Sequence, residues 1–370
     1  MTDRERLLAA LRYQPLDRLP HHELGLWGQT AEQFIDAGMP EDATRNWFYG
    51  CDFIGLDHRD FIPLDCGPVP AYEYEVLEQT DRYSTYRDKW GIVHKALETG
   101  TVRGTRASMD QYVRFPVEIR EDFREMKRRY DPASPDRRPD DRPERVERWR
   151  TRECPLCLLT NASFGLYSHM RRWMGTENLS LAFYRQPVLV EEMVEFLADF
   201  FIELTTPALE EVEVDYFNFF EDFAYKTGPL LSPKLFRRFL MPAYKRIIAH
   251  LHRHGVKFIW LDSDGNPEVL IPLMLEAGIN CLWPLEAAAG MDPVGLREEY
   301  GRDLRLSGGI DKRALAKGRD AIDEELGRRL RPLLPDGGYI PTIDHTVPPD
   351  VPYDNFMYYI EQKRRMLEEG

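Results

Sequence analysis

The feature that most constrains the fold of this chain is a regular alternation of apolar runs and amphipathic helical stretches that begins near residue 155. Each run is short and continuously apolar, as in strands that are buried on both faces, and a helical stretch follows it before the next run. This rhythm predicts a parallel sheet covered by helices. The runs are 156–161, 214–220, 256–261, 279–284, 304–306 and 339–343.

Two further apolar segments, 18–26 and 51–57, precede these six runs. Together they give about eight strands, the number that closes a (β/α)8 barrel. We therefore predict an α/β fold in which residues 1–370 form a single TIM barrel. A doubly wound open sheet is the alternative, but the sequence has neither the GxGxxG nor the GxxxxGK[ST] phosphate-binding turn that often accompanies it.

Residues 72–151 do not follow this rhythm. Their first part, to about residue 114, alternates polar and apolar residues with a period of two, which predicts antiparallel β-hairpins. The second part, 117–151, is mostly charged and is typical of a solvated loop and helix. We interpret 72–151 as an insertion within the barrel domain.

Composition narrows the classes of function. The 370 residues carry a net charge of −14, which argues against nucleic-acid and anionic-membrane partners because both require a basic surface. No apolar run is long enough to cross a membrane, and the N-terminus lacks an apolar signal core. Five cysteines do not make a disulfide framework. We expect a cytoplasmic enzyme.

Polar residues gather where the predicted strands end, which is where barrel enzymes place their chemistry. A few of them, Asp311 above all, are equally typical of helix N-caps. The candidates for substrate binding are Glu23, Trp27, Asn161, Glu221, Asp222, Tyr225, Asn266 and Glu286.

The segment WLDSDGN (260–266) is the most informative of these strand ends. If the strand continues, Asp262 and Asp264 point the same way, and two carboxylates this close require a cation, a proton or an arginine between them. Asp344 and His345 follow another strand, and histidine suits both proton transfer and metal binding. We predict that Asp262, Asp264, Asp344 and His345 are catalytic. Asp262, Asp264 and His345 are also the candidate ligands of a divalent metal.

Several of these segments resemble the uroporphyrinogen decarboxylase superfamily. That superfamily includes corrinoid-linked methyltransferases and is similar in fold to cobalamin-independent methionine synthase. The resemblance covers most of the chain and implies the same single barrel. It is carried by NASFGLYSHMRRWMGTENL (161–179), FEDFAYKTGPLLSP (220–233), WLDSDGN (260–266), LWPLEAAAGMD (282–292), LSGGIDKRAL (306–315) and GGYIPTIDHTVPPDVPYDNF (337–356).

The chain departs from both branches of this superfamily. The decarboxylases carry an arginine-rich motif after the first strand, where this chain has HHELGLWGQ (21–29). The methyltransferases bind zinc with a His-x-Cys and a later cysteine, where this chain has Asp262-Ser263-Asp264 and no cysteine near residue 344. Soft thiolate ligation of zinc is therefore lost, which leaves a metal held by oxygen ligands or no metal.

The resemblance implies an enzyme that moves a methyl group between a small substrate or pterin and a corrinoid carried by a separate protein. A decarboxylase is the first alternative, acting on uroporphyrinogen or on a smaller carboxylic acid. The second alternative is a homologue that binds a cation or another ligand without turnover.

Overall fold

A parallel seven-stranded sheet forms the centre of the protein in the computed structural model, which describes residues 1–103, 105–106, 109–160 and 163–369. Every pairing in this sheet is parallel. The strands follow one another in chain order: β1 (Asp60–Ile62), β8 (Leu156–Leu158), β9 (Tyr216–Phe220), β12 (Phe258–Asp262), β13 (Cys281–Trp283), β14 (Arg305–Ser307) and β15 (Tyr339–Ile340).

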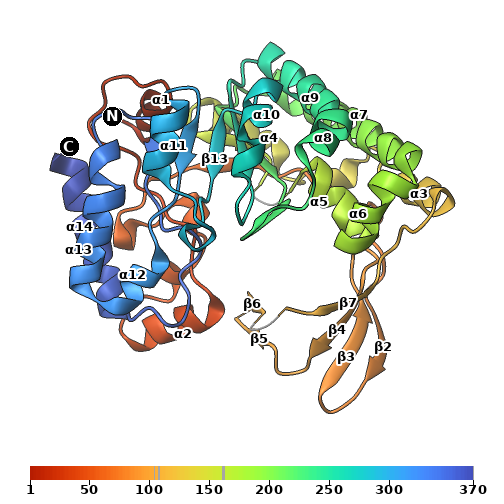
Figure 1. Cartoon of the computed structure of the whole chain (residues 1–370), viewed down its shortest axis with the longest axis horizontal. Coiled ribbons are helices and arrows are strands. Elements are labelled where there is room, and N and C mark those ends of the chain that lie inside the picture. Colours follow the sequence, from red (N-terminus) through yellow and green to blue (C-terminus); the bar gives the residue numbers. More distant parts are fainter. Residues whose placement is uncertain (104, 107–108, 161–162, 370) are drawn as a thin grey trace.

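Helices that follow the strands cover the outer face of this curled sheet (Figure 1). Successive apolar side chains of β12 pack on opposite faces of the sheet. Ile259 and Leu261 belong to the large core under the helices, whereas Phe258 and Trp260 belong to a second cluster on the inner face. The main helices are α5 (Leu166–Met174), α6 (Thr176–Arg185), α7 (Pro187–Glu211), α9 (Met241–Arg253), α10 (Ile271–Ala277), α11 (Pro293–Tyr300), α12 (Lys312–Lys317), α13 (Arg319–Arg329) and α14 (Tyr353–Glu369).

Shorter elements connect this frame. They are α2 (Gly28–Asp36), η1 (Asp42–Thr44), η2 (Trp47–Tyr49), β10 (Ala224–Tyr225), β11 (Gly228–Pro229), α8 (Pro233–Leu235), η5 (Phe236–Leu240), η6 (Glu268–Leu270), η7 (Ala287–Ala289) and η8 (Arg331–Leu333). None of the helices in the described ranges combines the length and the apolar character that crossing a lipid bilayer requires.

Segment 18–26, the predicted first strand, contacts both ends of the sheet without being a regular strand. On one side the His21 carbonyl accepts a hydrogen bond from the Asp57 amide at 2.9 Å. On the other side Leu26 forms a parallel bridge with Val347. The prediction of an α/β fold with a parallel sheet covered by helices is confirmed, whereas a complete eight-stranded barrel is not.

The prediction of a strand over 51–57 is wrong. Residues Asp52–Ile54 form a short 3-10 helix (η3). The strand of this region is β1, which begins at Asp60, three residues after the end of the predicted strand. Gly50 and Gly55 bracket the turn with φ of 112° and 68°, a backbone region that glycine adopts at little cost. Two such residues within six are incompatible with a continuous strand.

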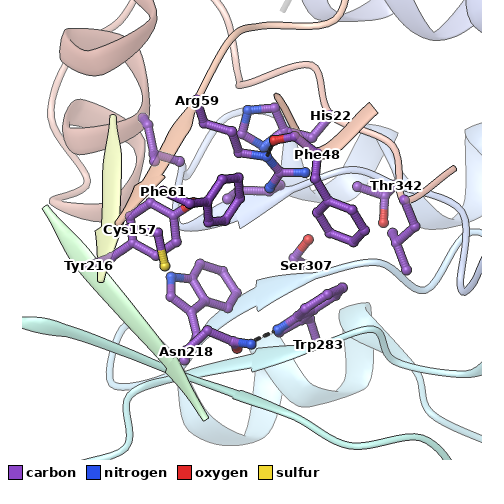
Figure 2. Close-up of a pocket in the computed structure, with 14 residues that line it drawn as sticks. His22, Phe48, Arg59, Phe61, Cys157, Tyr216, Asn218, Trp283, Ser307 and Thr342 are labelled. Carbon is purple, nitrogen blue, oxygen red and sulfur yellow. Dashed lines mark hydrogen bonds between the residues drawn. The ribbon is translucent and has the colours of Figure 1, made fainter. Parts of the chain in front are cut away.

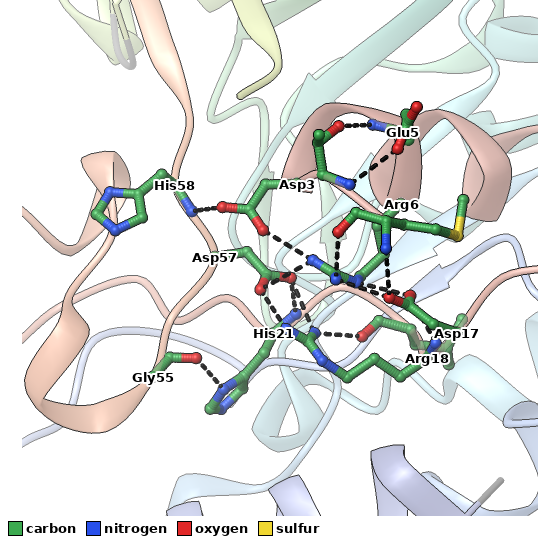
Figure 3. A network of polar contacts seen from close by, with 12 residues as sticks. Asp3, Glu5, Arg6, Asp17, Arg18, His21, Gly55, Asp57 and His58 are labelled. Carbon is green, nitrogen blue, oxygen red and sulfur yellow. Dashed lines mark hydrogen bonds and ion pairs between the residues drawn. The ribbon is translucent and has the colours of Figure 1, made fainter. Parts of the chain in front are cut away.

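Asp57, which we placed at a strand end, lies instead in a network of polar contacts beside helix α1 (Asp3–Leu11; Figure 3). Its carboxylate accepts hydrogen bonds from Arg18 at 2.5 and 3.0 Å and from the His21 amide at 2.9 Å. Arg6 reaches the same carboxylate at 3.4 Å. These contacts tie the first helix to the chain that follows it.

The segments 75–79, 83–87, 93–97 and 111–114 pair in antiparallel fashion, as the sequence predicts, and they project away from the main sheet (Figure 1). The charged stretch that follows is anchored rather than loose, because Arg137 is buried and donates hydrogen bonds to four backbone carbonyls. That 72–151 is an insertion stays a prediction. The elements are β2 (Glu75–Gln79), β3 (Tyr83–Arg87), β4 (Val93–Leu97), β5 (Thr101–Val102), β6 (Thr105–Arg106), β7 (Gln111–Arg114), α3 (Arg120–Lys127), η4 (Pro135–Arg137) and α4 (Arg142–Arg150).

Candidate active site at the carboxyl ends of the strands

Three carboxylates meet at the carboxyl ends of β9 and β12. Asp222, Asp262 and Asp264 each place an oxygen within 4.8 Å of the other two. The register explains this meeting, because Phe220 pairs with Asp262 and the chains that continue from both strands therefore leave at the same level. The Asp264 amide also approaches the Asp222 carboxylate at 3.4 Å. We call these three residues the acidic cluster.

Burial and mutual repulsion disfavour the fully ionised state of the acidic cluster. Burial, reinforced by the charges of Asp222 and Asp264, raises the pKa of Asp262 well above its usual range. Burial and the charge of Asp264 also raise the pKa of Asp222, although Arg171 contacts that carboxylate at 3.2 Å and acts in the opposite direction. The cluster can therefore hold a proton or a cation near neutral pH.

His345 lies beside the acidic cluster. Its Nε2 atom is 3.6 Å from an Asp264 carboxylate oxygen, and its Nδ1 atom is 2.9 Å from the Thr346 hydroxyl. Burial works against the imidazolium, but the hydrogen bond and the charge of Asp264 outweigh it and raise the pKa of His345. An imidazolium next to a partly exposed carboxylate can donate a proton to a bound molecule.

The predicted metal ligands were Asp262, Asp264 and His345. The structure brings Asp262 and Asp264 together, but the third residue of the tight group is Asp222, which we had assigned to substrate binding. Three carboxylate oxygens suit a hard divalent cation, and no cysteine of the described chain joins them, so the donor set does not fit thiolate-bound zinc. The catalytic and metal-binding roles of these residues stay predictions.

Asp344 and Glu286 lie on the neighbouring loops, and their carboxylates accept hydrogen bonds from backbone amides. Asp344 is fully buried and accepts hydrogen bonds from the Ala287 and Lys312 amides at 3.0 and 3.2 Å. Glu286 accepts one from the Gly265 amide at 2.8 Å. The Lys312 ammonium, which the sequence analysis missed, lies 3.4 Å from Asp344 and 3.9 Å from Glu286. Burial raises the pKa of Asp344, and Lys312 opposes that effect.

Glu221 is a buried helix cap. Its carboxylate accepts hydrogen bonds from the first amides of α5, those of Leu166, Tyr167 and Ser168, at 2.7 to 3.1 Å, and from the Tyr244 hydroxyl. Burial raises the pKa of Glu221 to about 7, while these donors favour its charged form. Its side chain has no exposed surface, so this placement does not support the predicted role in substrate binding.

Glu23 is buried in a different part of the molecule. It forms an ion pair with Lys363 of α14 at 2.5 Å, and it accepts hydrogen bonds from the Tyr359 hydroxyl and the Ile343 amide. Both charged side chains have no exposed surface. Glu23 therefore ties the first segment of the chain to the last helix, and its position does not support substrate binding.

The remaining predicted binding residues differ in their surroundings. Tyr225 is 61% exposed on the short β10–β11 hairpin. Asn266 holds a loop in place, because its side chain donates to the Ala289 carbonyl and accepts from the Glu268 amide. Trp27 is half-buried at the start of α2. Asn161 lies outside the described residues.

A cavity of about 50 Å³ lies on the inner face of the sheet (Figure 2). Its lining includes Trp283, which pairs in register with Asp262 and donates a hydrogen bond to Asn218 at 2.7 Å. This cavity is not evident from single motifs of the sequence, although the period-two pattern of the strands carries the signal. Its lining residues are Leu7, His22, Leu24, Phe48, Arg59, Phe61, Cys157, Tyr216, Asn218, Trp260, Trp283, Ser307, Ile340 and Thr342.

Comparison with known proteins places the chain in a family. A curated uroporphyrinogen decarboxylase from Syntrophotalea carbinolica is 23% identical over 226 residues, which are 58% of this chain and 60% of that protein. The match thus spans less than two thirds of the curated relative. In structure, the chain is similar to a methyltransferase from Methanosarcina mazei, with a TM-score of 0.60, 17% identity and 99% coverage of both chains.

A B12-independent methionine synthase from Shewanella sp. W3-18-1 shares 13% identity, with a TM-score of 0.35 and coverage of 80% and 76% of the two chains. The sequence model of the family described as "Uroporphyrinogen decarboxylase (URO-D)" matches residues 111–366, which is more than half of the chain. The chain belongs to the uroporphyrinogen decarboxylase (URO-D) family.

Proposed function

We propose that this protein is an enzyme that transfers a methyl group between a small substrate or pterin and a corrinoid carried by a separate protein. The observation that carries the proposal is the pairing of His345 with the acidic cluster through Asp264. Removing a methyl group from oxygen, nitrogen or sulfur leaves an electron pair on that atom, and a positioned acid lowers the barrier by protonating it.

In this proposal each group has a defined task. His345 donates the proton, and Asp264 holds it in the charged form. Asp262, kept protonated by burial, orients the substrate as a hydrogen-bond donor. The corrinoid of the partner supplies the site that accepts or gives the methyl group. The two neighbours Asp344 and Glu286 hold the surrounding loops through the amides that they bind.

A divalent cation is compatible with this proposal. It would be held by oxygens of Asp222, Asp262 and Asp264, and it would take the place of the proton that the cluster otherwise requires. We also propose that segment 18–26 closes the barrel in the place of an eighth strand, without being a regular strand itself. The backbone contacts of His21 with Asp57 and of Leu26 with Val347 support this closure.

Methyl transfer can be tested with free cob(I)alamin as the acceptor. The purified protein is incubated with methylated small molecules of several classes, and formation of methylcobalamin is followed by its absorption spectrum. We expect catalytic methylation with at least one class of donor. Failure with every class, both with free cobalamin and with corrinoid proteins encoded nearby in the genome, would contradict the proposal.

Decarboxylation of a small carboxylic acid is the second candidate. It is favoured by Asp262, a buried carboxyl group whose raised pKa makes it a proton donor. A decarboxylated carbanion requires such a donor. Release of CO₂ from a panel of small acids, without formation of methylcobalamin, would select this activity over methyl transfer.

A further inference from the structure

The cavity on the inner face of the sheet contains a cation that lacks an acidic partner. Arg59 is half-buried, and its guanidinium lies 5.0 Å from the centre of the Phe48 ring and donates to the Phe48 carbonyl at 2.6 Å. None of the carboxylates in the described part of the chain forms an ion pair with it. A guanidinium has five N–H donors and cannot lose its charge near neutral pH, so it favours an anion at its open edge.

His22 presents a second polar group in the same cavity. Its side chain is 3% exposed, and its Nδ1 atom is buried without a hydrogen-bond partner. Burial and the charge of Arg59 hold the pKa of His22 well below its usual range, so the ring is neutral. A neutral imidazole carries one N–H donor, and leaving that donor unpaired costs free energy.

The rest of the cavity is largely apolar and aromatic. Figure 2 shows His22, Arg59 and Phe48 on one side of the space, with Trp283 and Asn218 on the opposite side. The volume of the cavity is about 50 Å³. The occupant is therefore small, with one polar end and an apolar body.

We propose that this cavity binds a small monocarboxylate, whose carboxylate lies between Arg59 and His22 and whose apolar body lies against the aromatic side chains. Two planar oxygens match the fork of the guanidinium, and one of them can accept the N–H of the neutral His22 ring. A cation is excluded by the charge of Arg59. A phosphate is bulkier and requires more donors than this lining shows.

This inference deepens the proposed function, because it names the chemical class of the substrate. Trp283 lines the cavity and pairs in register with Asp262, so the cavity reaches the level of the acidic cluster. Arg59 immediately precedes β1, and Tyr216, which also lines the cavity, begins β9. The carboxylate thus lies toward the amino ends of the strands, and the body of the ligand points toward Asp262.

Binding can be measured without any reaction. Butyrate is titrated into the full-length protein by calorimetry, with tryptophan fluorescence as a second readout because Trp260 and Trp283 line the cavity. Butyramide has nearly the same shape without the charge. We expect butyrate to bind at least tenfold more tightly than butyramide. We expect Arg59→Met to weaken butyrate binding at least tenfold without changing the affinity for butyramide.

Two further variants serve as controls. Arg302→Met removes an exposed arginine that does not line the cavity, and it should leave butyrate binding unchanged. Arg59→Lys keeps the charge without the fork and should retain an intermediate affinity, so it remains informative if Arg59→Met folds poorly. Equal affinity for acid and amide, or unchanged butyrate binding in both folded Arg59 variants, would overturn the inference.

The binding experiment contains neither methyl donor nor corrinoid, so its outcome is independent of the methyl-transfer assay. Butyrate binding that depends on Arg59, without methyl transfer to cobalamin, would leave the cavity site standing and remove the proposed reaction. Methyl transfer without charge-dependent binding would support the proposed reaction and remove the carboxylate site in the cavity.

Discussion

The His345 Nε2 atom lies 3.6 Å from an Asp264 carboxylate oxygen, and this contact joins two strand ends that are about 80 residues apart in the sequence. Asp264 has two tasks there. Its charge adds to burial in raising the pKa of Asp262 and Asp222, which favours their neutral forms, and it raises the pKa of His345 against burial, which favours the charged form. One carboxylate thus shifts the pKa of three neighbours.

The variant Asp264→Asn should make the protein more stable at high pH. Because the folded-state pKa of Asp262 is raised, its contribution to stability is complete below the unfolded pKa of about 3.9 and is lost as pH rises through the folded value. Removing Asp264 reduces that loss. We expect the variant to be more stable than the wild type at pH 8 and to lose this advantage near pH 3.5, where Asp262 is protonated in both states and the contact of Asp264 with His345 is missing.

Urea unfolding at both pH values, with a chelator present, measures this difference. Asp81→Asn changes an exposed aspartate in the projecting hairpins and serves as the matched control. Its difference in stability from the wild type should be the same at both pH values. A variant Asp264→Asn that is no more stable than the wild type at pH 8 would show that repulsion in the acidic cluster is already relieved.

Replacing Glu221 should lower the free energy of unfolding much more than replacing its hydrogen-bond partner Tyr244. Glu221→Ala leaves three amides at the start of α5 without their acceptor in a buried position, and we expect a loss of about 3 kcal/mol or more. Tyr244→Phe removes one donor and should cost about 1 kcal/mol. Equal losses in urea unfolding would mean that the carboxylate does not cap the helix.

The fold was largely predictable because strand periodicity is a local property. The runs 214–220 and 256–261 contain the residues of β9 and β12 almost completely, since continuous apolar residues fit a strand buried on both faces. The segment 51–57 is also apolar, but Gly50 and Gly55 turn the backbone there. Apolar content alone did not distinguish a buried turn from a buried strand.

The site was predictable only where proximity follows from strand ends. Asp222, Asp262 and Asp264 meet because β9 and β12 are neighbours in register. The burial of Glu23 depends on Lys363, which is 340 residues away, and no local pattern reports such a pairing. Arg59 was overlooked because an arginine in front of a strand usually faces solvent.

Arg137 should control access of proteases to the charged stretch that follows the hairpins. Its guanidinium donates to the carbonyls of Asp131, Asp65, Gly67 and Arg129 at 2.7 to 2.8 Å. Arg137→Lys keeps a tryptic site but loses most of these bonds, so trypsin should cut between 132 and 148 several-fold faster. Arg138→Lys, whose bonds are longer than 3.2 Å, is the control and should leave the rate unchanged. Equal rates for the two variants would contradict the anchoring role.

Uroporphyrinogen III should not be a substrate. It carries eight carboxylates, and the acidic cluster would repel such a polyanion. The segment HHELGLWGQ (21–29) has no arginine to compensate. We expect no coproporphyrinogen above background at catalytic enzyme concentration, as measured by chromatography of the oxidised porphyrins. Sustained product formation would contradict this prediction and would show that the protein has the decarboxylase activity that the family name describes.

His345→Gln should slow the proposed methyl transfer by about 10²–10⁴-fold in kcat, the usual cost of losing a general acid, with a much smaller change in KM. The working form is the imidazolium, whose pKa Asp264 raises above its ordinary value. Wild-type activity should therefore be highest below that pKa and fall as pH rises through it. His345→Gln should abolish this fall together with the rate.

Thr346→Val separates orientation of the ring from its chemistry, because it removes the hydroxyl that His345 Nδ1 contacts at 2.9 Å. We expect it to lower kcat by roughly tenfold or less while the pH dependence persists. The two variants are compared in the methylcobalamin assay over pH 5–9. If His345→Gln keeps kcat within threefold of the wild type, or keeps its pH dependence, then His345 does not supply the proton and the acid must come from Asp262.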